Sequence, residues 1–493
     1  MASERTTKAL APSLLVVAGG TLIDGSGRPP LRDALVTIKG KRIESVAAQQ
    51  AGSVPKGAQM VDARGKTILP GLFDMHLHYK DFFPEMLLHW GVTAVRDMGN
   101  DAPVWMIAQR EFINRELIYG PRLFTVGISL ESRATGHHRC VMTPEEGVEA
   151  ARWLFNKLEV DGVKVYRRIY PEVYQAIARE TLAHGKWLAG HLGNVERVNG
   201  RRLGLTAVEA AEIGIHSLEH GFGIPESAVD QPEEIREMDG VRRDIVCWNA
   251  AKPERLKKVI EVLVEKKIYV CPTILNRWEE VFPQRAKYGP EDEAILSDPN
   301  LSYVPTLYRE GFKRLWSSDS EIAHSRVTNP EGIRLKRQAL DRYQQFLRDF
   351  VSAGGLVIPG TGAGNTTPGI ALHREMELMA DAGLTPMQVI QAATLRSAEF
   401  LGVSQELGSV EPGKLADLVV VDGDPLQDIS SSRNVSTVIK DGRVLDIGFH
   451  ADYRNPLPRP FQIGDHEDGL REAFDKLDSF RSLFLTRPGG ANF

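Results

Sequence analysis

The stretch Gly71-Leu-Phe-Asp-Met-His-Leu-His78 decides the fold, because it is predicted to be the first of eight buried strands. Seven further apolar runs follow it, at residues 93–98, 122–127, 162–166, 187–191, 217–221, 268–274 and 356–360. Amphipathic helical segments lie between these runs, for example at residues 171–184 and 331–353. Eight strands that alternate with helices favour an α/β fold of the closed (β/α)8 TIM-barrel type over an open sheet.

Two β-rich pieces flank this region. Residues 14–68 alternate β-branched runs with turn residues, and residues 414–445 have the same character. One connection, at about residues 276–329, is too long for an ordinary loop, and its aromatic and charged residues favour a helical lid over a disordered segment. The tail after Leu445 has two open interpretations, a clamp on a neighbouring subunit and a loose surface arm.

Composition argues against several classes of partner. The 493 residues include 60 Lys and Arg against 65 Asp and Glu, and no basic run is long enough to follow the phosphates of a nucleic acid. The three cysteines, Cys140, Cys247 and Cys271, are scattered without CxxC spacing, which indicates a reducing compartment. Because no apolar window reaches the length of a transmembrane helix, we expect a cytoplasmic protein without a membrane partner.

Histidines stand at the ends of several predicted strands. His76 and His78 are two residues apart on one strand, which places both imidazoles on the same face, where they can share a metal ion. This pair alone is a weak signal. His191 ends the fifth strand and His220 ends the sixth, and the carboxyl ends of barrel strands face a common site. The four histidines together predict a metal site.

Lys164 lies inside the fourth predicted strand, between apolar residues that would bury it. Two interpretations are open. An edge-strand lysine would point to solvent, whereas a carbamylated lysine would bridge two metal ions. The second interpretation turns a buried cation into an oxygen-donor anion, which removes the cost of burying an unpaired charge. The neighbouring histidines favour it.

These residues belong to motifs by which the chain resembles the amidohydrolase superfamily, and within it the imidazolonepropionase-like and prolidase-like branch. The resemblance covers nearly the whole chain. Its motifs are Ile68-Leu-Pro-Gly-Leu-Phe-Asp-Met-His-Leu-His78, Asp161-Gly-Val-Lys-Val165, Leu188-Ala-Gly-His191, Ser217-Leu-Glu-His-Gly221, Pro272-Thr273, Leu384-Thr-Pro-Met-Gln-Val-Ile-Gln-Ala-Ala-Thr394 and Leu407-Gly-Ser-Val-Glu-Pro-Gly-Lys-Leu-Ala-Asp-Leu418. Together they are specific for the family and say little about the substrate.

The resemblance implies a division of the chain into three parts. Both chain ends, residues 1–69 and 402–448, would form a small composite β-sandwich. Residues 70–401 would form the metal-binding barrel, with the insertion described above, and residues 449–493 a C-terminal extension. The resemblance also implies a homo-oligomer.

The resemblance further implies two divalent metal ions, most often zinc. His76 and His78 would hold one ion and His191 and His220 the other, with carbamylated Lys164 between them. Such a pair generates hydroxide from a bridging water and polarises a carbonyl. We therefore expect a metal-dependent hydrolase that cleaves an amide bond, or an ester, lactone or carbamate C–O bond, of a small molecule.

The chain departs from the family at the end of the eighth strand. There the family has Gly-Thr-Asp, whose aspartate binds the first metal and carries a proton from the bridging water to the leaving group. This chain reads Pro359-Gly-Thr-Gly-Ala-Gly364, so the acid position is Gly362. The chain is an altered variant, a naturally degenerate member, or an enzyme whose leaving group departs unprotonated. Asn365 and His373 are nearby in sequence as substitutes, and Asn365 is also predicted to contact the substrate.

Loop residues supply further candidates. His137 and His138 follow the third strand, where the family often has a substrate-binding histidine; an ordinary polar loop is the alternative. His138 is predicted to be catalytic and His137 to bind substrate. Tyr166 lies two residues after Lys164 and would donate to a substrate carbonyl. Arg139 would pair with a substrate carboxylate, unless it faces solvent as loop arginines often do.

Gly362 also keeps a rival function open. A catalytically weakened or inactive member would retain the scaffold and metal or ligand binding without turnover. Loss of a positioned acid/base costs roughly 10²- to 10⁴-fold in rate.

Overall fold

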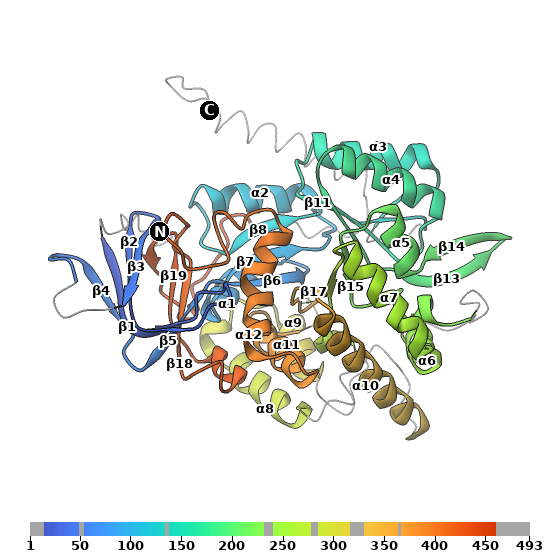
Figure 1. The fold of residues 1–493 in the computed structure, drawn as a ribbon. Helices are drawn as coiled ribbons and strands as arrows, with labels where there is room; N and C mark the ends of the chain where they lie inside the picture. The colour runs from blue at the N-terminus through green and yellow to red at the C-terminus, as the bar shows by residue number, and fades with distance from the viewer. Residues whose placement is uncertain are drawn as a thin grey trace.

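The computed structural model describes residues 14–48, 54–133, 138–230, 240–277, 284–315, 330–362 and 366–459. Within them the eight predicted strands are all present, and those paired in a ladder are parallel. Figure 1 shows the strands enclosed by helices. They are β6 (Leu72–Leu77), β7 (Val92–Asp97), β8 (Arg122–Thr125), β11 (Gly162–Val165), β12 (Trp187–Gly190), β15 (Ser217–Glu219), β16 (Tyr269–Cys271) and β17 (Leu356–Val357). The strands are almost wholly buried, as expected when helices cover a parallel sheet.

The barrel strands form two ladders. One contains β6, β7 and β8, and the other runs β11-β12-β15-β16-β17 and is extended beyond β11 by the short strands β9 (Leu130–Glu131) and β10 (Arg139–Cys140). Backbone hydrogen bonds join the two ladders at both junctions. The Met75 amide donates to the Pro359 carbonyl at 2.8 Å, and the Asp161 amide donates to the Thr125 carbonyl at 2.9 Å. The predicted TIM-barrel fold is confirmed.

Strands from both parts of the chain that flank the barrel share one eight-stranded sheet. The order is β20-β19-β18-β5-β1-β2-β3, with β4 also paired to β1, and β18 joins the two parts by pairing antiparallel with β5. The bounds are β1 (Leu15–Leu22), β2 (Leu31–Lys39), β3 (Arg42–Ala48), β4 (Gln59–Asp62), β5 (Lys66–Pro70), β18 (Leu418–Asp422), β19 (Val435–Lys440) and β20 (Arg443–Val444). This sheet lies beside the barrel (Figure 1). The exact domain bounds stay a prediction.

Helices pack around the barrel strands. They are α1 (Phe83–His89), α2 (Pro103–Asn114), α3 (Pro144–Asn156), α4 (Pro171–Ala183), α5 (Ala207–Ile213), α6 (Gly240–Ala250), α7 (Pro253–Glu265), α10 (Pro330–Ser352), α11 (Ile370–Asp381), α12 (Pro386–Gln391) and α13 (Ser397–Phe400). Local sequence determines where two of these helices begin. Thr143 and Glu146 form a reciprocal capping box at the N-terminus of α3. Thr206 and Glu209 form another at the N-terminus of α5. A hairpin of β13 (Gly193–Val198) and β14 (Arg201–Leu205) projects after β12 (Figure 1).

The described part of the 276–329 insertion is helical. It contains α8 (Arg285–Leu296) and α9 (Thr306–Leu315). Asp292 of α8 pairs with Arg374 of α11 at 2.8 Å, and Tyr308 of α9 packs against Phe82 in the loop after β6. The role of this segment as a lid stays a prediction. Among the described residues, no helix combines the length and apolar character needed to cross a bilayer.

Candidate metal centre

The predicted metal ligands meet at the carboxyl ends of the barrel strands. The His76 ring lies 4.4 Å from the His220 ring and 5.7 Å from the His78 ring, and the His191 ring lies 4.6 Å from that of His220. Lys164 Nζ lies 3.4 Å from His76 Nε2. Lys164 is only 2% exposed, so it does not point to solvent. Five residues, carried by four strands or by the positions just after them, therefore lie close together.

Hydrogen bonds set the orientation of three of the imidazoles. His76 Nδ1 donates to Glu219 Oε2 at 2.6 Å, and His78 Nδ1 donates to the Gly99 carbonyl at 2.8 Å. His220 Nδ1 lies 2.5 Å from the Thr273 hydroxyl. In each ring the Nδ1 contact leaves Nε2 for another partner, which is how proteins fix the tautomer of a metal-binding histidine.

The electrostatics keep these imidazoles neutral. Burial, strengthened by the Lys164 cation, holds the pKa of His76 well below its ordinary value, and the same two causes lower the pKa of His78 to about 3. Burial also lowers the pKa of Lys164 to about 8. Neutral imidazole is the form that binds a metal, and a neutral amine is the form that reacts with carbon dioxide.

An unpartnered histidine nitrogen also indicates that these residues can hold a metal ion. His191 Nε2 is buried and has no hydrogen-bond partner among the described residues. A buried nitrogen without a partner costs free energy unless something binds it. The four imidazoles form a set that suits zinc and also accommodates other divalent transition metals.

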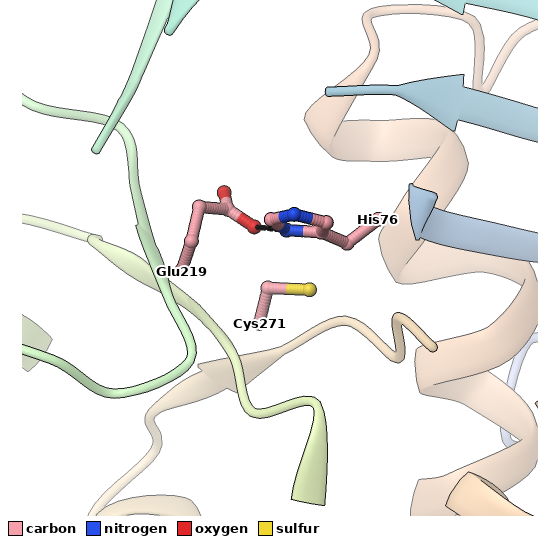
Figure 2. Close-up of side chains that lie close together, drawn as sticks. All are labelled: His76, Glu219 and Cys271. Carbon is pink, nitrogen blue, oxygen red and sulfur yellow. Dashed lines mark hydrogen bonds and ion pairs between the residues drawn. The ribbon is translucent and has the colours of Figure 1, made fainter. Parts of the chain in front are cut away.

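A second group of ligand-type atoms lies beside this site. Atoms of His76, Glu219 and Cys271 lie within 4.8 Å of one another (Figure 2). Glu219, however, already accepts from His76 and from Arg96, at 2.9 Å for the arginine, and burial raises the pKa of the Cys271 thiol well above 9.0. Because its carboxylate is already engaged and its thiol is protonated, we assign this group to the support of His76.

Tyr166 and His138 join the cluster, as predicted for residues near the site. The Tyr166 ring lies 4.6 Å from the His191 ring, and the His138 ring stacks on Tyr166 at 4.1 Å. Arg139 instead lies over the ring of Trp153 of α3, at 5.1 Å. The predicted contact of Arg139 with a substrate carboxylate stays a prediction. His137 and Asn365 lie outside the described residues.

Gly362 is tied to the first barrel strand. Its amide donates to the His76 carbonyl at 2.6 Å, and its φ is +62°. The preceding Thr361 donates from its hydroxyl to Asp74 Oδ2 at 2.6 Å. Burial raises the pKa of Asp74 to about 7.

His373, the other suggested substitute for the missing acid, is buried and hydrogen-bonded to Ser432 and to the Trp90 carbonyl. It therefore contributes to packing at that place.

Several supporting residues were not singled out from the sequence. Asp74 stands two residues before His76, so the same alternation that pairs His76 with His78 places it on their face. Glu219 is a charged residue inside an apolar strand, which is itself a signal of a buried partner. That partner, Arg96, lies on a different strand, and only the tertiary structure reveals it.

Comparison with known proteins agrees with this architecture. The pattern described as "Amidohydrolase family" matches residues 67–445. A dihydroorotase from Pelotomaculum thermopropionicum is 24% identical over 86% of this chain and 92% of its own length. An imidazolonepropionase from Geobacillus sp. is 24% identical over 38% of this chain, which spans half of that protein. The crystal structure of a Xaa-Pro dipeptidase with bound methionine superposes with a TM-score of 0.61 and 23% identity, over 88% of this chain and all of that one.

The match covers most of the chain, so the class of protein follows. The chain belongs to the amidohydrolase family, whose members are hydrolases that act on small molecules and generally bind divalent metals. The resemblance inferred from the motifs is confirmed.

Proposed function

We propose that the protein is a metal-dependent hydrolase of an amide, ester, lactone or carbamate bond in a small molecule. The observation that supports this most strongly is the convergence of His76, His78, Lys164, His191 and His220. The proposal includes two metal ions, with zinc as the first candidate and carbamylated Lys164 between them. Homo-oligomeric assembly and a cytoplasmic location stay predictions.

The metal ions, when bound, supply hydroxide at neutral pH and polarise the substrate carbonyl. The protein contributes orientation. Glu219 holds the His76 ring, and Thr361 is fixed to Asp74 at the adjoining strand end. Tyr166 is half-buried beside His191, where its hydroxyl can donate to a substrate oxygen. His138, which contacts the Ser129 hydroxyl at 2.5 Å, keeps the Tyr166 ring in place by stacking.

A weakened or inactive member is the second candidate function. Gly362 favours it, because a glycine supplies neither a metal ligand nor a proton carrier. Such a protein would bind metal through the same five residues and would have no turnover.

Metal analysis of the purified protein, combined with a substrate screen, separates the two functions. The screen contains dipeptides, N-acyl amino acids, lactones and aryl esters. Turnover that disappears on chelation and returns with zinc is the expected result. Full metal occupancy with no turnover of any substrate class would contradict the hydrolase function and support the inactive, metal-binding function. The control variant is Asn249→Ala on the outer helix α6, which should behave as the wild type.

A further inference from the structure

The space beside Gly362 is filled by another side chain. A Cβ built at Gly362 would lie 3.1 Å from Cγ of Asn276 and closer still to its Nδ2, too close for a non-bonded contact. The carboxamide of Asn276 therefore lies against the position that the Cβ of residue 362 would take, and it would have to shift to admit a side chain there. A simple loss of a carboxylate would instead leave a gap there.

Asn276 also has an unused hydrogen-bonding group. Its Oδ1 is buried and has no partner among the described residues. Gly362 follows directly on Thr361 and donates to the backbone of His76, so the Asn276 carboxamide beside Gly362 lies next to the end of the first barrel strand. An enclosed amide oxygen without a protein partner is suited to accept a hydrogen bond from a bound molecule.

Side chains of two neighbouring segments hold the turn that carries Asn276 in place. Glu375 of α11 accepts from the amides of Ile274 and Leu275, each at 2.8 Å. On the other side Thr273, with a φ of +42°, contacts His220 through its hydroxyl. Such support fixes the backbone from which the Asn276 side chain extends, as the orienting group of a site requires.

We propose that Asn276 replaces the missing strand-end aspartate as an orienting group and that it carries no proton. This inference rests on the proposed function and narrows its substrate class. A carboxamide can orient water or a carbonyl by hydrogen bonding, but it does not accept a proton near neutral pH. The site is therefore directed to aryl esters and aryl carbamates, whose leaving group departs as a stable anion.

The reaction balances without a protein acid. Hydroxide adds to the acyl carbon, the acyl C–O bond breaks, and its electron pair leaves with the aryl oxygen. One aryl ester and one hydroxide give one carboxylic acid and one phenolate, and the carboxylic acid loses its proton to solvent. An anilide would have to expel a far more basic nitrogen anion, which requires the proton that Asn276 does not supply.

A matched pair of substrates tests the chemistry. An aryl ester and an anilide with the same acyl group are compared in the zinc-loaded wild type, Asn276→Ala, Asn276→Asp and the control Asn249→Ala. Asn276→Ala should lower kcat/KM for the ester at least about tenfold with metal content unchanged. Asn276→Asp should raise the anilide-to-ester ratio of kcat/KM at least about tenfold. An unchanged ester rate in the first variant, or an unchanged ratio in the second, overturns the inference.

A second measurement tests the packing without any activity. In the metal-free protein, Gly362→Ala should lower Tm more in the wild-type background than in Asn276→Ala, because the added methyl group meets the carboxamide only in the former. Equal losses of Tm would show that Asn276 does not occupy this space. Zinc-loaded wild type that hydrolyses neither substrate overturns this inference, as do the contrary results of the ratio and Tm comparisons. The proposed function fails only if no substrate class of the wider screen is hydrolysed.

Discussion

The Nδ1 of His76 donates to Oε2 of Glu219 at 2.6 Å, and both side chains are almost completely buried. The same carboxylate accepts from Arg96 and, at 2.5 Å, from the Ser217 hydroxyl. One buried acid therefore orients a proposed metal ligand and neutralises a buried arginine. This double role makes Glu219 the most informative residue outside the proposed ligand set.

Glu219→Gln should weaken zinc binding about 10- to 100-fold, because a neutral amide holds the His76 ring less firmly than a carboxylate does. The free energy of unfolding should also fall by about 3–5 kcal/mol, because Arg96 keeps its charge without a buried anionic partner. Competition with a chromophoric chelator measures the affinity. Ser217→Ala, which removes a different contact of Glu219, is the control. An equal loss of affinity in both variants would argue against a specific role for the His76 contact.

Lys164 should take up carbon dioxide. Its pKa of about 8, lowered by burial, leaves part of the amine neutral at physiological pH, and only the neutral amine forms a carbamate. With ¹³C-bicarbonate and zinc, we expect a carbamate carbon signal in the NMR spectrum that is absent from Lys164→Arg. Lys336→Arg, at a buried lysine of the outer helix α10, is the matched control and should keep the signal. A signal that survives in Lys164→Arg would place the modification elsewhere.

Glu375 should make the protein less stable as the pH rises. Burial raises its pKa from 4.5 to about 8, so between these values the folded protein keeps a proton that the unfolded chain has lost. The free energy of unfolding then falls with rising pH, by at most about 1.4 kcal/mol per pH unit for one proton. Below about pH 4.5 both states are protonated, and above about pH 8 the full penalty is present.

Urea unfolding of the metal-free protein at several pH values measures this slope. Glu375→Gln should flatten it, although the variant loses some stability at every pH because an amide nitrogen now faces a backbone amide. Glu254→Gln, at an exposed position of α7, controls for the loss of one carboxylate. A slope that is the same in all three proteins would contradict the assignment to Glu375.

The barrel could be predicted from the sequence because its strands are short apolar runs that end in polar residues. The proposed ligands were predicted from two local patterns, the alternation of His76 and His78 and the position of His191 and His220 at strand ends. A lysine between valines, Lys164, signalled burial by its neighbours alone. Each of these signals lies within a few residues of the group it identifies.

The supporting contacts could not be predicted in the same way, because they join residues far apart in the chain. Asn276 and Gly362 meet only after β16 and β17 have paired, and no local pattern marks Asn276 as the filler of that space. The orientation of Arg139 depends on Trp153 of a later helix. Tertiary packing, and not local propensity, decides these contacts.

Restoring the aspartate should need two changes. In Gly362→Asp the new Cβ meets Asn276, so the single variant should gain little anilide hydrolysis. In Gly362→Asp combined with Asn276→Ala the carboxylate has room, and the φ of +62° is one that aspartate tolerates better than most residues. Here kcat/KM for the anilide should rise at least about tenfold over the wild type, because a positioned acid/base can now protonate the leaving nitrogen. Asn276→Ala alone supplies no acid and serves as the control. If the double variant gains nothing while retaining its zinc, some other group already protonates the leaving atom, and the identity of residue 362 does not limit the reaction.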